Sequence, residues 1–151
     1  FVLSNALDVP SVLALAAAAS HASLSLDAMS LETARLRDRL EKGVEGEIQG
    51  ANVLLRDSLR LPNTSVLSIP HVHQESLLYA LQRKHLFATI GGLSMPHLSR
   101  HLLACGFDER TAQTAISFSL SRFTTPSEID RAIALIAQTA RSLRLLSEDL
   151  L

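Results

Sequence analysis

The stretch from residue 115 to residue 130 places the tightest limits on how this chain folds, because an apolar run leads directly into a clearly marked helix start. The run AISFSL suits a short buried strand. In the TTPSEID that follows, Thr125 is a predicted N-cap, Pro126 takes the first helical position and Glu128 lies three residues after the cap. A strand followed by an amphipathic helix predicts a fold in which helices cover a sheet.

Periodic apolar patterns and turn residues predict the other elements. Helices are expected over residues 10–21, 25–42, 74–83, 96–104 and 108–114, with Gly43 and Gly46 ending the second and Asp108 capping the last. Strands are expected over residues 52–55, 65–69, 86–90 and 116–120, the first two pairing antiparallel. We find no repeat or low-complexity linker. The sequence therefore predicts one α+β domain over residues 1–151, a small and mainly antiparallel sheet covered by helices.

Composition narrows the classes of partner. Hydrophobic residues make up 47% of the chain, which is enough to form a core. The formal net charge is -1, so the composition gives no sign of the positive surface that binds nucleic acid. The longest apolar run, residues 12–19, is too short to span a bilayer, so we expect no membrane partner and a cytoplasmic location. The single cysteine, Cys105, excludes an intrachain disulfide. Because the chain begins at Phe1, we expect a fragment or a processed product.

Three segments carry a resemblance to a known family: RLPNT at residues 60–64, KHLFATIGGLS at 84–94 and SFSLSRFTTPSEID at 117–130. They resemble the C-terminal small domain of the cysteine desulfurases, pyridoxal-phosphate-dependent enzymes of the class V aminotransferase group. The resemblance implies the C-terminal domain of a fold-type I enzyme, with the large cofactor-binding domain absent from this chain. It also implies pyridoxal 5'-phosphate held mostly by that missing domain, a homodimeric full-length protein and an iron–sulfur scaffold protein as partner.

The chain departs from the family at the positions to which the resemblance gives chemical roles. Ala6 stands at the family's threonine, which contacts the cofactor phosphate of the neighbouring subunit, and alanine cannot donate that hydrogen bond. Ser94 stands at the catalytic cysteine, and a hydroxyl cannot hold sulfane sulfur as a thiolate does. Ser117 stands at the arginine that clamps the substrate carboxylate. The catalytic, substrate-binding and cofactor-binding residues of this chain are therefore left unassigned.

Other polar residues have simpler interpretations. Cys105 ends a hydrophobic predicted helix and is interpreted as a buried packing residue. His97 and His101 have a spacing that can grip a metal, but the sequence places no third ligand, so we predict no metal site. His71 and His73 are interpreted as ordinary surface histidines.

Three functions remain open. The first is a fragment of a cysteine desulfurase, which takes sulfur from cysteine for iron–sulfur cluster assembly, with its key catalytic positions changed. The second is a diverged or inactive relative that serves as a binding or regulatory protein. The third is a free-standing interaction module without cofactor. This chain on its own is expected not to catalyse a reaction of the family's kind, because the family's cofactor lysine belongs to the other domain.

Overall fold

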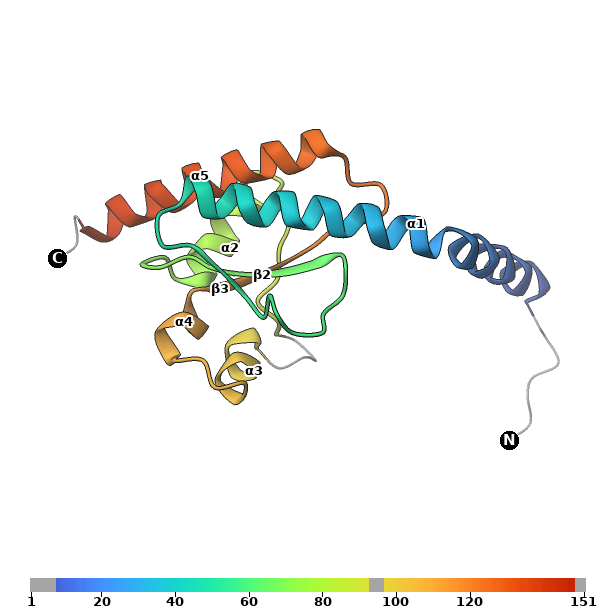
Figure 1. The fold of residues 1–151 in the computed structure, drawn as a ribbon, viewed down its shortest axis with the longest axis horizontal. Helices are drawn as coiled ribbons and strands as arrows, with labels where there is room; N and C mark the ends of the chain where they lie inside the picture. The colour runs from blue at the N-terminus through green and yellow to red at the C-terminus, as the bar shows by residue number, and fades with distance from the viewer. Residues whose placement is uncertain (1–7, 93–96, 149–151) are drawn as a thin grey trace.

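The fold is a three-stranded sheet with helices on both faces. The computed structural model describes residues 8–92 and 97–148. In chain order its elements are α1 (Val9–Glu47), β1 (Asn52–Leu54), β2 (Thr64–Ser68), α2 (Gln74–Gln82), α3 (Leu98–Ala104), α4 (Glu109–Gln113), β3 (Ala115–Ser119) and α5 (Pro126–Glu148). Figure 1 shows α1 and α5 lying side by side over one face of the sheet, with α3 and α4 beyond the other face. The predicted α+β class is confirmed.

The sheet is antiparallel throughout, in the order β1-β2-β3. Val53 lies opposite Leu67, and Leu67 lies opposite Ile116. The predicted pairing of the first two strands is therefore confirmed. The central position of β2 buries both its backbone edges, so its hydrogen-bonding groups are paired on each side.

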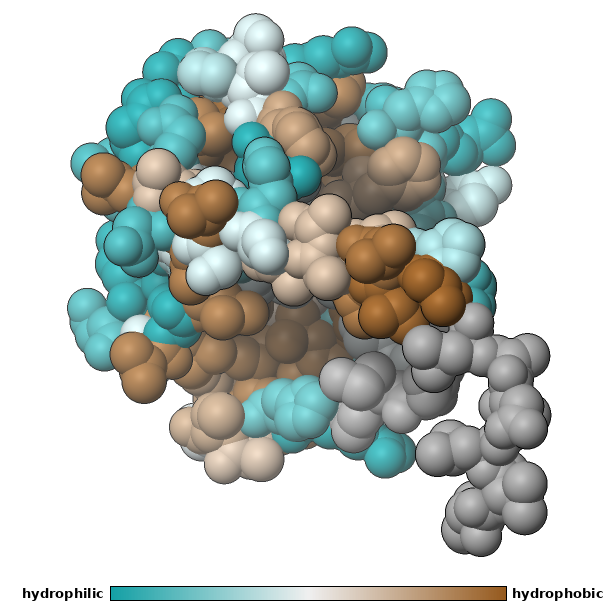
Figure 2. All heavy atoms as spheres, turned by 90° about the vertical axis from the view of Figure 1, so that its right-hand side faces the viewer, coloured by the Kyte–Doolittle hydropathy of each residue, from teal (hydrophilic) through white to brown (hydrophobic). Residues whose placement is uncertain are grey.

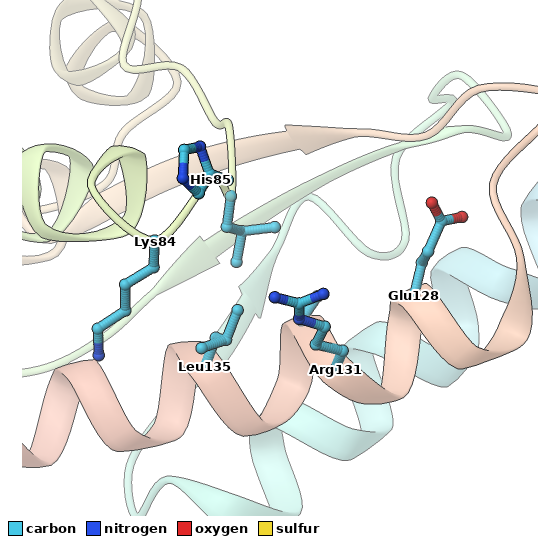
Figure 3. Close-up of a pocket in the computed structure, with 7 residues that line it drawn as sticks. Lys84, His85, Glu128, Arg131 and Leu135 are labelled. Carbon is cyan, nitrogen blue, oxygen red and sulfur yellow. The ribbon is translucent and has the colours of Figure 1, made fainter.

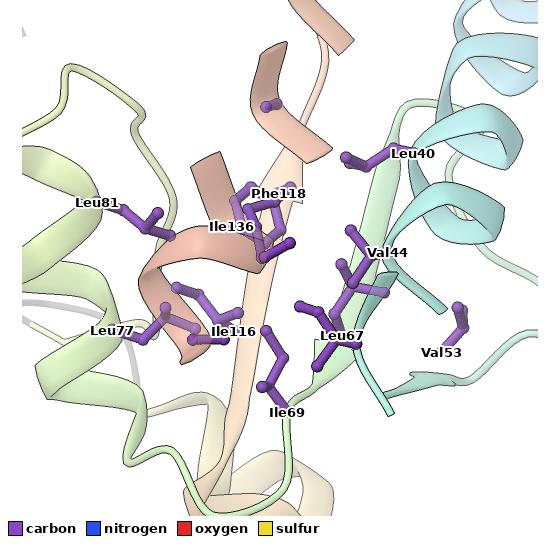
Figure 4. Packing of buried hydrophobic residues seen from close by; sticks show 14 of the residues in the cluster. Leu40, Val44, Val53, Leu67, Ile69, Leu77, Leu81, Ile116, Phe118 and Ile136 are labelled. Atoms are coloured by element: carbon purple, nitrogen blue, oxygen red, sulfur yellow. The ribbon is translucent and has the colours of Figure 1, made fainter. Parts of the chain in front are cut away.

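Alternate residues of the strands point into the core beneath α1 and α5. Leu67, Ile116 and Ile136 are each 0% exposed, and Figure 4 shows their side chains meeting those of α1 and α2. A smaller cluster on the other face joins Leu102 and Ala112 to the sheet. Burial of these side chains is the main force holding the helices to the sheet.

The first helix differs from the prediction. Two helices were expected, over residues 10–21 and 25–42, with Gly43 and Gly46 ending the second. α1 runs without a break for 39 residues, roughly 58 Å at 1.5 Å per residue. It begins at Asp8, whose side chain accepts a hydrogen bond from the Ser11 amide. Gly43 lies inside it, where α1 meets α5: a Cβ there would be 2.3 Å from Ile133 Cδ1. The glycine therefore permits a close helix contact instead of ending the helix.

The N-terminal half of α1 projects from the body of the domain (Figure 1). Residues 9–24 are all exposed, including Leu13 at 65% and Leu15 at 71%. Figure 2, which views the molecule from this end, shows apolar side chains gathered beside the start of the helix. Exposed apolar surface of this extent is typical of a site that contacts another protein or a membrane.

The projecting half also bears on the expectation that no apolar segment is long enough to span a membrane. An 18-residue window of α1 has mean hydropathy 1.5 and is 0% buried, so the helix is long and apolar enough to cross a membrane by length and composition alone. The sequence argument counted only an uninterrupted apolar run, whereas serines and a histidine interrupt a longer apolar stretch. Core helices and signal sequences share this property, so it does not by itself assign a membrane.

Residues 86–90 do not form the predicted strand. Only Thr89 bridges to β3, opposite Ser117. Phe87 instead turns outward and is 72% exposed. The segment of residues 84–92, which we call the connector, therefore meets the edge of β3 at Thr89, while Phe87 lies away from it.

Candidate functional site

The connector and β3 bring together two of the segments that carry the family resemblance. The amide of Thr89 donates to the Ser117 carbonyl at 2.9 Å, and the Ser117 amide donates back to Thr89 at 2.9 Å. Thr89 Oγ1 accepts a hydrogen bond from the Gly91 amide at 3.0 Å. Gly91 and Gly92 then have φ of 77° and 108°, a left-handed conformation that favours glycine. Ser117 therefore lies directly beside the segment that leads to Ser94.

Ser117 is 9% exposed in the middle of β3. Its side chain lies on the sheet face opposite to Ile116 and Phe118, because side chains alternate along a strand. A neutral hydroxyl is short and offers one donor, so it cannot form the two parallel hydrogen bonds that a guanidinium gives to a carboxylate. Ser117 therefore supplies no fixed positive charge at this position.

Two of the three predicted positions lie outside the described residues. Ala6 precedes the first described residue, and Ser94 lies within residues 93–96. The described residues on either side of Ser94 are anchored: the Leu98 amide donates to the Ile90 carbonyl at 2.8 Å. The roles of Ala6 and Ser94 therefore stay predictions.

The turn after β3 is built as the sequence predicts. The Thr125 amide donates to Glu128 Oε2 at 2.7 Å, and the Glu128 amide donates to Thr125 Oγ1 at 3.3 Å. These bonds form the expected capping box at the start of α5. The hydrogen bond from the Thr125 amide lowers the pKa of Glu128 below its usual value, and the bond from the Thr125 hydroxyl adds a smaller effect in the same direction. The capped helix start thus fixes the direction of the preceding turn.

Arg122, in this turn, links the site to the projecting half of α1. Its guanidinium lies 4.7 Å from the centre of the Phe123 ring, and Nη1 lies 3.1 Å from Nδ1 of His21. A guanidinium nitrogen can only donate, so Nδ1 of His21 is the acceptor in this contact. This contact was not predicted, because the two residues are 101 positions apart in the sequence.

A groove separates the connector from the N-terminal half of α5. One hollow of about 260 Å³ is lined by Phe87, Phe118 and Leu120 together with parts of α1 and α5. A second, of about 220 Å³, is lined by Lys84, Arg131 and Leu135 (Figure 3). The two hollows share His85, Leu86, Glu128 and Ala132, so we call them together the edge groove.

The prediction that Cys105 is buried is wrong. It forms the C-cap of α3 and is exposed. The sequence pattern identified the end of a hydrophobic helix correctly, but only Leu102 on that helix reaches the core. Cys105 follows the last helical residue of α3, and residues 103–106 at this end of the helix are all exposed.

No metal site forms among the described residues. The described part of the chain holds no group of three or more histidine, cysteine or acidic side chains that could bind a metal ion. His97 caps α3, and His101 is exposed on its last turn. His71 and His73 are exposed, as predicted, and line a broad hollow with Glu109 and Arg110.

A buried ion pair stabilises the RLPNT segment, and sequence reasoning missed it. Arg60 donates to both carboxylate oxygens of Glu41, at 2.6 and 3.1 Å. The Glu41 side chain is 4% exposed, and Arg37 Nε lies 3.8 Å away. The hydrogen bond to Glu41 raises the pKa of Arg60 above its ordinary value. The segment is thus fastened to α1 by charge as well as by packing.

Comparison with known proteins gives a consistent result. The chain is 34% identical over 146 residues to cysteine desulfurase 2 of Trichormus variabilis, covering 93% of this chain and 36% of that protein. It is 32% identical over 148 residues to cysteine desulfurase IscS of Anaeromyxobacter sp. (strain K), covering 95% of this chain and 36% of that protein. No family model matches the chain. The chain thus spans about a third of the length of these relatives.

The solved structures agree. A protein described as NifS-like superposes with a TM-score of 0.76 at 27% identity, over 89% of this chain and 34% of the other. A NifS-like protein from Rickettsia africae superposes with a TM-score of 0.63 at 23% identity, over 73% of this chain. The second likeness concerns the fold alone. Sequence and fold therefore point to the same group of proteins.

Proposed function

We propose that this chain, which is the C-terminal small domain of a cysteine desulfurase-like protein, covers a pyridoxal-phosphate site held mostly by a larger domain, and that its parent does not release sulfur from cysteine. The observation that carries the proposal is Ser117. In place of a bidentate cation, β3 presents a neutral hydroxyl at a position that is 9% exposed. Removing a charged donor from a carboxylate contact typically costs about 1.5–3 kcal/mol of binding.

The projecting half of α1 supports docking onto a larger domain. This half is apolar and rich in alanine, and small side chains allow a close approach of another surface. The relatives that the chain matches are nearly three times as long, since 146 residues correspond to 36% of one of them. If a larger folded domain covered α1, the connector and β3 would also lie over the surface of that domain.

The proposal places the lysine that anchors pyridoxal phosphate outside this chain. The chain has only two lysines, Lys42 and Lys84. Lys84 donates to Thr139 Oγ1 at 3.0 Å on α5, and Lys42 is exposed on α1. Because Lys84 is engaged by Thr139 and Lys42 faces solvent, the cofactor in this proposal is bound by groups of the other domain.

The proposal extends to the assembly and its location. In it the full-length protein is a cytoplasmic homodimer, with an iron–sulfur scaffold protein as its partner and no contact with nucleic acid or membrane. The formal net charge of -1 supports the absence of a nucleic-acid role. Gel filtration of the parent and salt-dependent binding to a scaffold protein test these points.

A second function is favoured by the same changes. If the parent binds cofactor without turnover, it serves as a binding or regulatory protein. Loss of the clamp at Ser117 reduces capture of an amino acid substrate but leaves the helices and sheet intact, which suits a scaffold kept for its surfaces. Cofactor absorbance by the parent, measured together with turnover, separates this function from a changed reaction.

The test is cysteine-dependent alanine formation by the full-length parent with pyridoxal phosphate supplied. We expect the wild type to stay at background and expect activity to appear only when Ser94→Cys and Ser117→Arg are combined. The single Ser94→Cys variant shows whether the thiol alone is limiting. Alanine formation by the wild type well above background would overturn the proposal.

A further inference from the structure

The outer edge of β3 is paired at one residue and open at the next. Ser117 exchanges two backbone hydrogen bonds with Thr89. Because backbone N–H and C=O groups alternate in direction along a strand, those of Ser119 point to this same edge. An antiparallel continuation would place Phe87 opposite Ser119, yet no backbone hydrogen bond joins these two among the described residues. Ser119 thus presents one donor and one acceptor at the edge.

The edge groove opens where the two segments separate. Its larger hollow, about 260 Å³, is lined by both Phe87 and Ser119 and has Phe118 and Leu120 on its floor. Phe118 and Leu120 face α5, on the opposite side of the sheet from the Ser119 side chain. Each hollow is smaller than the roughly 300–1,000 Å³ of a typical small-molecule site. This size suits a single side chain of a bound peptide.

The charges along the groove are mainly positive. Figure 3 shows Lys84 and Arg131 on either side of Leu135. No carboxylate of the described residues forms an ion pair with Arg131, and Lys84 is held by a hydroxyl at 3.0 Å. The carboxylate of Glu128 is engaged by the Thr125 cap at 2.7 and 2.9 Å. An acidic side chain in the groove would therefore find cations available.

We propose that the edge groove binds an extended peptide segment of a partner protein, which adds to β3 as an edge strand through the backbone of Ser119. Strand addition supplies backbone hydrogen bonds, and pockets for alternate side chains supply specificity. Residues two positions apart on a strand share a face. The segment that fits carries an apolar residue for the hollow beside Phe118 and, two residues along, an acidic residue for Arg131.

The test uses the full 151-residue chain and a fluorescein-labelled, blocked, threonine-rich peptide with one leucine and one aspartate two residues apart. Fluorescence anisotropy measures the Kd. Arg131→Glu should weaken binding about tenfold or more, the equivalent of about 1.4 kcal/mol for one charge contact. Ser119→Pro removes the edge amide, which no residue of β2 uses, and should weaken binding by a similar factor. Circular dichroism verifies that both variants are folded.

Matched controls separate the groove from general charge. Arg100→Glu makes the same charge change on exposed α3 and should leave the Kd unchanged. A peptide with lysine in place of aspartate, and one methylated at the amides that pair with the strand, should both bind poorly. Absence of peptide binding at millimolar concentration, or equal Kd values for wild type, Arg131→Glu and Ser119→Pro, refutes the proposal. Self-association of the chain that Ser119→Pro abolishes would show a second copy as occupant and would also refute it.

Discussion

The contact between Gly43 and Ile133 gives the sharpest prediction about the fold. A methyl group at residue 43 would place its carbon 2.3 Å from Ile133 Cδ1, 2.9 Å from Cγ1 and 3.2 Å from Cγ2. Rotation of the terminal methyl relieves the first contact only, so the whole Ile133 side chain has to shift. Overpacking of this kind costs about 1–3 kcal/mol. The same substitution gains up to about 1 kcal/mol of helix propensity. Gly43→Ala should therefore destabilise the chain by about 0–2 kcal/mol.

Gly46 provides a matched control on the same helix. A Cβ at Gly46 meets nothing within 4 Å, so Gly46→Ala should gain propensity without crowding. Because Gly46 lies in the last turn of α1, its gain should be somewhat below 1 kcal/mol. The free-energy difference between the two variants then measures mainly the crowding, about 1–3 kcal/mol.

Urea unfolding followed by circular dichroism at 25 °C measures both variants, with the midpoints compared at a common m-value. The double variant Gly43→Ala/Ile133→Val removes the nearest carbon and should recover part of the loss. Its coupling energy should exceed about 0.5 kcal/mol. If Gly43→Ala is as stable as Gly46→Ala, or if the two substitutions in the double variant are additive, the close contact between α1 and α5 is not as described.

Three further predictions concern the core, the buried ion pair and the helix cap. Arg60→Met leaves the Glu41 carboxylate, 4% exposed, with only a 3.8 Å contact to Arg37. The variant should lose about 3 kcal/mol of unfolding free energy in urea. A loss of less than about 1 kcal/mol would contradict a buried pair. Leu67→Ala, at a side chain that is 0% exposed, should lower stability by about 2–5 kcal/mol in the same assay, and a neutral effect would place Leu67 outside the core. Thr125 lowers the folded-state pKa of Glu128 from 4.5. The negative charge of Glu128 therefore stabilises the fold above pH 4.5, and this contribution is lost as the pH falls through the lowered pKa. Glu128→Gln should therefore be less stable than wild type at pH 7, with the difference vanishing in strong acid; a difference independent of pH would rule out the charged cap.

Local features were predictable where neighbouring residues decide the structure. The Thr125 cap and Glu128 define the start of α5, and Asp108 begins α4, because each side chain bonds to an amide three residues away. The pairing of β1 with β2 was also predictable, since two short apolar runs separated by turn residues have few other partners. The family resemblance needed only such local segments.

Features set by distant contacts were not predictable. Gly43 was expected to end a helix, but burial of α1 against α5 outweighs the local cost of a glycine within the helix. Residues 86–90 have a strand-like composition, yet only Thr89 finds a partner on β3, and the open edge begins where Phe87 turns away. Cys105 is exposed because the end of α3 at residues 103–106 lies away from the core, which its apolar neighbours in the sequence do not reveal.

The departures that the family resemblance predicts at Ala6, Ser94 and Ser117 depend on residue type alone, because an alanine or a serine lacks the groups of a threonine, a cysteine or an arginine wherever it lies. What the tertiary structure added is position. It brings Ser117 beside the connector that leads to Ser94, and it places Arg131 in the same edge groove as Ser119. Residue chemistry is a local property, whereas the meeting of side chains from distant segments depends on how helices and sheet bury their apolar faces together.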